Sequence, residues 1–168
     1  EYLPEVNFNS AETPLVESQI FASFGGVVRS AEEHLQVTVP PKATPEGLII
    51  THTPHRFTES DDTEAIIRFD LSARTTAGVP VTQFAEPLTL TIRYPDLPIE
   101  WAQERFLNIA YFDEGVRQWV PLPTTVDVQT NVATTYVDHF TEFQLTVLNG
   151  ITITKHAPSV AAAGDPIT

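Results

Sequence analysis

Residues 88–94 read LTLTIRY, and this stretch decides the fold. Leucine and isoleucine occupy positions 88, 90 and 92, while threonine and arginine occupy positions 89, 91 and 93. An alternation with a period of two predicts a β-strand that buries one face and exposes the other. Pro95 and Pro98 follow directly and end the run, because proline cannot donate to a strand ladder.

Similar short runs recur along most of the chain, separated by turn signals such as Pro40-Pro41 and Asp113-Glu114-Gly115. The only helical suggestion is a single turn within residues 99–105. Short strands at such spacing predict an all-β antiparallel sandwich of about eight to ten strands, immunoglobulin-like or similar. The other expected strands are residues 35–39, 48–52, 65–71, 106–112, 117–121, 124–128, 132–137 and 143–147.

The pattern divides the chain into three parts. Residues 1–24 are expected to be an arm or linker, although residues 19–22 (QIFA) can pair with a sheet edge. Residues 25–148 form the sandwich domain. Residues 149–168 are expected to be a linker and the start of a following module, or a tail strand.

Composition excludes several classes of function. The chain has 22 acidic residues against 9 Lys and Arg, a formal net charge of −13, which disfavours a nucleic-acid partner. It has no cysteine, so disulfides and thiolate metal sites are excluded. No apolar stretch is long enough to span a membrane. Many Thr and Val, 14 Pro and few Lys resemble bacterial surface and secreted proteins, so we expect an extracellular or cell-surface location.

The tripeptide His139-Phe140-Thr141 is the one reactive motif. The Thr141 hydroxyl follows the Phe140 carbonyl and can attack it in an N-to-O acyl shift, with the imidazole of His139 taking up the proton. This would be a single self-cleavage, not turnover of a substrate. The structural alternative is that His139 caps a strand end, Phe140 fills the core and Thr141 is a β-branched strand residue.

Three short motifs carry a family resemblance: Gly25-Gly26-Val27-Val28, residues 39–43 (VPPKA) and His139-Phe140-Thr141. Together they make residues 25–148 resemble the ZU-five sandwich domain. Some members of that family cleave themselves at a His-Phe-Ser motif, which here has threonine in place of serine. By this resemblance, His139 is the base, Phe140 the carbonyl donor and Thr141 the nucleophile. Residues 151–168 resemble the opening of tandem bacterial surface repeats.

Metal sites are weaker candidates. His52 and His55 have a spacing that can bring two imidazoles to one metal, but a loop is the favoured interpretation. Carboxylates of Asp61-Asp62-Thr63-Glu64 and Asp113-Glu114-Gly115 are potential calcium ligands, although neither run matches a recognised loop pattern. We expect solvated turns there, and neither a metal nor a cofactor.

Trp101 and Trp119 are candidates for a sugar-stacking platform, and core or edge positions are the alternative. With only Lys42 and Lys155, intramolecular isopeptide links are disfavoured. No triad or carboxylate pair points to an enzyme acting on an outside substrate.

Three functions therefore remain open. The first is a non-catalytic structural or adhesive module of a larger surface protein, with self-cleavage at Phe140-Thr141 as an added possibility. The second is a carbohydrate- or calcium-binding module. The third is a filament subunit that exchanges a strand from residues 1–24 or 151–168 with a neighbour. The expected partners are neighbouring modules, copies of the same chain or a glycan.

Overall fold

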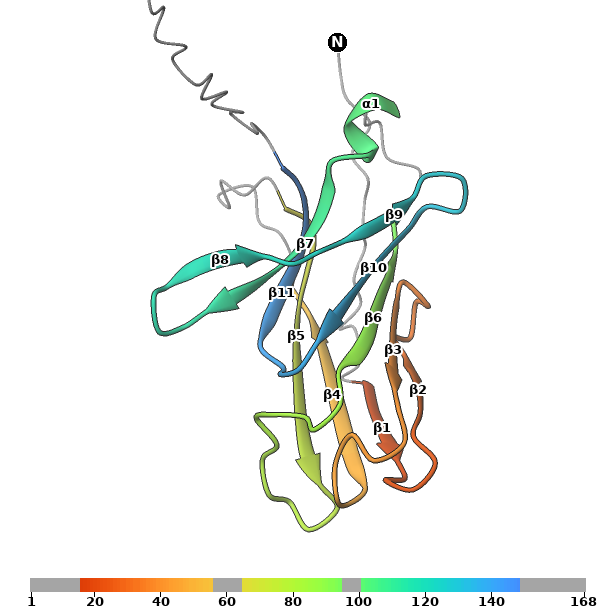
Figure 1. The fold of residues 1–168 in the computed structure, drawn as a ribbon, viewed down its shortest axis with the longest axis vertical. Coiled ribbons are helices and arrows are strands. Elements are labelled where there is room, and N and C mark those ends of the chain that lie inside the picture. The colour runs from red at the N-terminus through yellow and green to blue at the C-terminus, as the bar shows by residue number, and fades with distance from the viewer. Residues whose placement is uncertain (1–15, 56–64, 95–100, 149–168) are drawn as a thin grey trace, which may run out of the picture.

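The LTLTIR strand, β6 (Leu88–Arg93), lies at the centre of a five-stranded antiparallel sheet (Figure 1). The computed structural model describes residues 16–55, 65–94 and 101–148. In the five-stranded sheet the order is β2-β3-β6-β10-β9. Its other strands are β2 (Gly26–Arg29), β3 (Leu35–Val39), β9 (Thr125–Asp127) and β10 (Val132–Val137).

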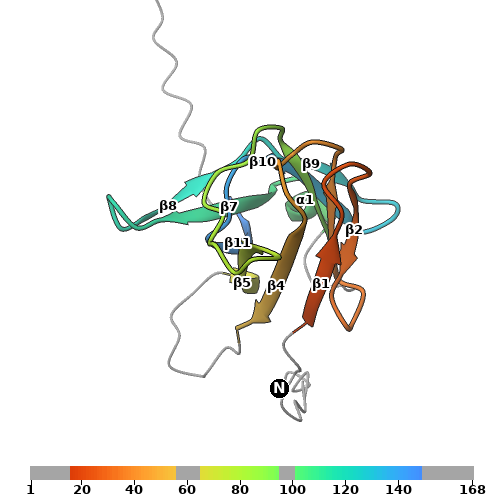
Figure 2. The ribbon, with the colours of Figure 1, turned by 90° about the horizontal axis from the view of Figure 1, so that it is seen from below.

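A six-stranded antiparallel sheet packs against it, in the order β1-β4-β5-β11-β7-β8. Figure 2 shows the two layers, with the β7–β8 hairpin projecting beyond them. One short helix, α1 (Trp101–Glu104), precedes β7, where a helical turn is expected from the sequence. The strands of this sheet are β1 (Val16–Ile20), β4 (Leu48–Pro54), β5 (Ala65–Thr75), β7 (Leu107–Asp113), β8 (Gln118–Pro121) and β11 (Glu142–Val147).

The predicted all-β antiparallel sandwich is confirmed, with eleven strands among the described residues instead of about eight to ten. Alternate side chains of the two sheets meet in one apolar core. Leu88, Leu90 and Ile92 of β6 are buried there, as their alternation predicts. Phe143 of β11 stacks on Phe69 of β5, with ring centroids 5.9 Å apart. Among the described residues, no helix is long and apolar enough to cross a membrane.

The two strands that the sequence pattern does not predict are β1, within the expected arm of residues 1–24, and β2, which follows Gly25. β1 forms the edge of the six-stranded sheet through pairing with β4, so part of residues 1–24 belongs to the sandwich. Gly25 has a φ of +66°, and a Cβ atom there would lie 2.2 Å from the Val39 carbonyl oxygen. Only glycine fits such a position. The glycine pair therefore forms a tight turn into β2, a strand that the sequence pattern does not predict.

Candidate functional site

The His139-Phe140-Thr141 motif lies in the link between β10 and β11, where the chain crosses from the five-stranded to the six-stranded sheet. The link is anchored at its start, because the Asp138 carbonyl accepts a hydrogen bond of 2.8 Å from the Phe84 N–H. The Phe140 ring then meets the Phe84 ring edge to face, with centroids 4.8 Å apart. One loop thus holds both the backbone and the aromatic side chain of the motif.

Thr141 is bonded to strands on both sides. Its hydroxyl donates to the carbonyl oxygen of Phe112 on β7, at 3.1 Å. Its own carbonyl accepts a hydrogen bond of 3.0 Å from the Leu71 N–H on β5. The hydroxyl proton is therefore directed at a backbone carbonyl, and the candidate nucleophile serves as a clasp between β7 and β11.

His139 forms a pair with the preceding carboxylate. Its Nδ1 lies 2.7 Å from Asp138 Oδ1, and its ring packs edge to face against Tyr111 at 4.8 Å. The hydrogen bond from His139 lowers the pKa of Asp138, with a smaller contribution from the Gln83 side chain. Because an ionised carboxylate only accepts hydrogen bonds, the proton lies on Nδ1, and the lone pair of a neutral ring is on Nε2. In that tautomer Nε2 of His139 can accept a proton.

Backbone strain of the left-handed kind is absent from this link. Among the described non-glycine residues, positive φ angles occur at Glu33, Lys42, Arg117 and Asn131, all outside residues 138–142. The motif thus has an imidazole that can accept a proton, but the Thr141 hydroxyl is already bonded to Phe112. The backbone around the Phe140 carbonyl has no left-handed strain.

The structure separates the two histidines of the candidate metal pair. His52 is only 8% exposed and packs its ring against Phe69 at 5.6 Å, inside the sandwich. Burial lowers its pKa to about 4. His55 instead bonds Asp70 on the outer side of the sheet, with Nε2 2.5 Å from Oδ2. A shared metal is therefore excluded, because the two rings lie on opposite sides of the six-stranded sheet.

Asp113-Glu114-Gly115 forms the hairpin turn between β7 and β8. Asp113 Oδ1 accepts hydrogen bonds from the N–H groups of Gly115 and Val116, at 2.8 and 3.2 Å. This is a turn in which the carboxylate satisfies backbone donors. Residues 61–64 lie outside the described residues. Within the part that is described, no group of three or more His, Asp or Glu side chains is arranged to hold a metal.

Trp119 does not present a free ring for sugar stacking. Its ring lies 5.1 Å from the Arg68 guanidinium carbon, and the Phe112 ring meets it at 5.3 Å. The side chain of Trp101 lies outside the described residues, so the predicted platform has one described member, and that member is packed.

Sequence reasoning missed an ionic network on the outer face of the six-stranded sheet. Glu142 and Asp70 are directly opposite in the β5–β11 register, a like-charge pair that would be unfavourable alone. His55 bridges them, at 2.5 Å from Asp70 and 3.8 Å from Glu142. Arg68 donates to Glu142 while it covers Trp119. The sequence signal for this network is the pair Arg68 and Asp70, which are charged residues at alternate positions of β5 and therefore share its outer face.

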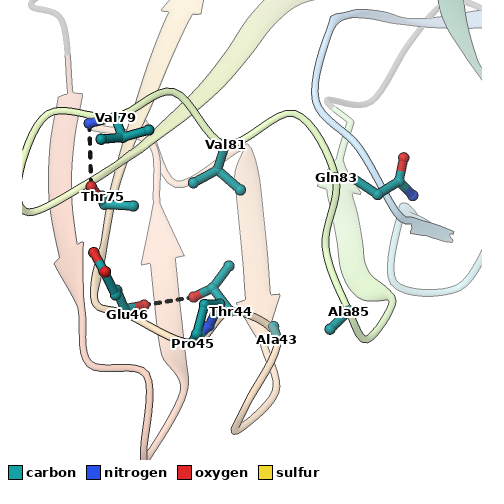
Figure 3. Close-up of a pocket in the computed structure, with 9 residues that line it drawn as sticks. All are labelled: Ala43, Thr44, Pro45, Glu46, Thr75, Val79, Val81, Gln83 and Ala85. Atoms are coloured by element: carbon teal, nitrogen blue, oxygen red, sulfur yellow. Dashed lines mark hydrogen bonds between the residues drawn. The ribbon is translucent and has the colours of Figure 1, made fainter.

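One shallow pocket of about 270 Å³ lies at the end of the sandwich that the β3–β4 and β5–β6 loops form (Figure 3). Figure 3 shows its walls, which are mostly apolar: Ala43, Thr44, Pro45, Glu46, Thr75, Val79, Val81, Gln83 and Ala85. One of its lining residues, Gln83, also hydrogen-bonds the Asp138 side chain beside the motif.

No protein-family model and no curated protein matches this chain.

Proposed function

We propose that this chain is a non-catalytic structural or adhesive β-sandwich module of a larger extracellular or cell-surface protein. The observation that carries the proposal is the bonding of Thr141, whose hydroxyl donates to Phe112 while its carbonyl accepts from Leu71. Thr141, the nucleophile of the one reactive motif, thus forms hydrogen bonds that connect the start of β11 to β5 and β7. A module of this kind acts by being stable and by presenting surfaces to its neighbours.

Composition and resemblance support the same proposal. The formal charge of −13 keeps the module soluble and away from nucleic acid. The VPPKA run, which carries part of the ZU-five resemblance, forms the end of β3 and the turn after it. In that turn Lys42 has a φ of 67° and its N–H donates to the Ala22 carbonyl at 2.9 Å. The resemblance to ZU-five domains and to bacterial surface repeats favours a position outside the cell.

Self-cleavage is the second candidate, and the Asp138–His139 pair favours it. The hydroxyl of Thr141 would first have to leave the Phe112 carbonyl. Its Oγ1 would then attack the Phe140 carbonyl carbon and pass its proton to Nε2 of His139. The peptide bond would break to give an ester and a free amine, and water would hydrolyse the ester to leave a new carboxylate.

Mass spectrometry of the denatured protein tests both candidates. The module proposal predicts one species at the intact mass of 18.6 kDa, unchanged in kind for Thr141→Ala and His139→Ala. Two fragments that meet at Phe140-Thr141 in the wild type and disappear in Thr141→Ala would overturn the non-catalytic proposal and establish self-cleavage.

A further inference from the structure

We propose that the loop end of the sandwich binds the same end of a second copy, as a two-fold symmetric pair. We call this end the apolar tip and define it by the β1–β2 turn (residues 21–25), the β3–β4 loop (40–47) and the β5–β6 loop (76–87). Figure 1 shows the three loops together at the lower end of the molecule. β1 runs toward this tip, and β11 runs away from it.

The tip exposes large apolar side chains. Phe24 is 82% exposed, Phe21 is 63% exposed, and Val79 in the β5–β6 loop is 58% exposed. Single exposed apolar residues are ordinary, but two phenylalanines and a valine at one end of a small domain form a patch of the kind that marks an interaction site.

The two rings are presented on a well-bonded turn. The N–H groups of Phe24 and Gly25 both donate to the Phe21 carbonyl, at 3.2 and 3.0 Å. The Ala22 carbonyl accepts from Lys42 at 2.9 Å, which ties the turn to the β3–β4 loop. Little backbone conformational entropy would therefore be lost when these rings enter a partner.

The pocket of the tip is suited to an inserted side chain. Its volume of about 270 Å³ is below the roughly 300–1,000 Å³ that is usual for small-molecule sites. Hydrogen bonds hold its walls: Thr44 Oγ1 donates to the Glu46 carbonyl at 2.6 Å, and the Val79 N–H donates to Thr75 Oγ1 at 3.2 Å (Figure 3). A hollow of this size and apolarity fits a phenyl ring.

The rings and the pocket lie on neighbouring loops. The β3–β4 loop is bonded on one side to the phenylalanine turn, through Lys42 and Ala22. On its other side it is bonded to the β5–β6 loop, because the Ala85 N–H donates to the Ala43 carbonyl at 2.8 Å. One surface thus carries both a projection and a hollow. In a two-fold pair, the projection of each copy meets the hollow of the other.

Charge favours a second copy over an anionic surface. The three loops contain one cation, Lys42, and two carboxylates, Glu46 and Glu86, a formal charge of −1 out of the −13 of the chain. Two such acidic molecules therefore repel each other only weakly through their tips. Two-fold pairing also allows Lys42 of one copy to face Glu46 or Glu86 of the other. A lone lysine is too little to attract an anionic membrane.

The available area predicts a weak dimer. With roughly 200 Å² for each ring, the exposed parts of Phe21 and Phe24 amount to about 300 Å² per copy. Covering an equal area of the partner in both directions gives about 1,200 Å² in total, the lower limit for specific interfaces. We expect a dissociation constant of the order of 10–100 μM.

Sedimentation velocity of the full chain tests the proposal between about 1 and 500 μM, a range that brackets the expected dissociation constant. The average mass should rise from 18.6 kDa toward twice that value. Phe24→Ser should weaken the association at least tenfold. The matched control is Phe106→Ser, which removes a ring that is 48% exposed just before β7, at the end of the sandwich opposite the tip, and should leave association unchanged.

A second variant tests the pocket and the symmetry. Val79→Asp should also weaken self-association at least tenfold, and thermal melting checks that each variant is folded. Mixed together, the two variants can form one of the two contacts, the Phe24 of one copy in the intact pocket of the other. The mixture should therefore associate more strongly than either variant alone.

Three outcomes would overturn the proposal. The wild type could stay monomeric over the whole range, or it could dimerise with no change on Phe24→Ser and Val79→Asp. Binding to phosphatidylcholine vesicles that is lost with Phe24→Ser, in the absence of dimerisation, would instead assign the tip to lipid.

Discussion

Replacing Thr141 with valine removes one hydroxyl and keeps a β-branched side chain of the same shape. The change deletes the hydrogen bond of 3.1 Å to the Phe112 carbonyl, which links β11 to β7. A hydrogen bond of this kind contributes about 0.5–1.5 kcal/mol net, and an acceptor left without its donor costs more where it is buried. Phe112 is only half-buried, so we expect the free energy of unfolding to fall by about 1–2 kcal/mol.

Urea unfolding followed by tryptophan fluorescence measures this loss. The unfolding midpoint should fall with no change in slope, because the surface exposed on unfolding stays the same. In a thermal melt the loss corresponds to about 3–6 °C for a domain of this size. Thr141→Ser keeps the hydroxyl and should retain most of the stability. Thr125→Val on the exposed edge strand β9 is the matched control and should change little.

The reasoning fails if Thr141→Val and Thr125→Val lower the midpoint equally. Such a result would mean that the Thr141 hydroxyl does not hold β7 to β11 in solution, and the hydroxyl would then be available for attack on Phe140. The same valine variant would abolish any cleavage, so denaturing mass analysis of the two samples distinguishes the two roles.

Three further changes test the core, the outer network and the β1–β2 turn. Burial lowers the pKa of His52 to about 4, so between pH 6.5 and pH 4 the unfolded chain binds a proton at this histidine and the folded protein does not. The free energy of unfolding should therefore be full above pH 6.5 and fall by up to about 3 kcal/mol toward pH 4. His52→Leu should remove this loss in urea titrations across that range. Arg68→Met removes the cation that contacts both the half-buried Glu142 carboxylate and the Trp119 ring, and should lower the free energy of unfolding by about 1–2 kcal/mol. The control is Arg74→Met, at an exposed ion pair, which should lower it by less than about 0.5 kcal/mol. Equal losses in the two variants would contradict a stabilising role of the network. Gly25→Ala should cost at least about 2 kcal/mol by thermal melting, and Gly78→Ala, which also has positive φ but open space around it, about 1 kcal/mol.

The alternation of apolar and polar residues predicts those strands in which every second side chain is buried, because burial requires apolar residues at these positions. β3, β6 and β11 are such strands, and each shows the buried and half-buried pattern that its sequence predicts. β2 leaves no such mark, since it is short and starts with glycine. Its identity as a strand comes from its pairing with β3 and from the close approach that Gly25 permits.

The side-chain clusters depend on strand register, which the sequence pattern does not contain. Arg68 and Glu142 bond although 74 positions separate them in the chain. His52 and His55 are only three positions apart in sequence, yet this odd spacing along an extended strand turns their rings to opposite sides of the sheet. Interpreting residues 52–55 as a loop hid this, whereas the strand extends to Pro54 and fixes the alternation.

The same dependence on register explains why the sequence of the His-Phe-Thr motif does not by itself predict its reactivity. Chain order places a hydroxyl beside a carbonyl, but the direction of the hydroxyl is set by β7, which pairs with β11 and offers the Phe112 oxygen. Attack on Phe140 requires that this bond be given up, at a cost of about 1 kcal/mol before any of the chemical barrier is met. The pairing that stabilises the sandwich is therefore the pairing that keeps the Thr141 hydroxyl from attacking Phe140.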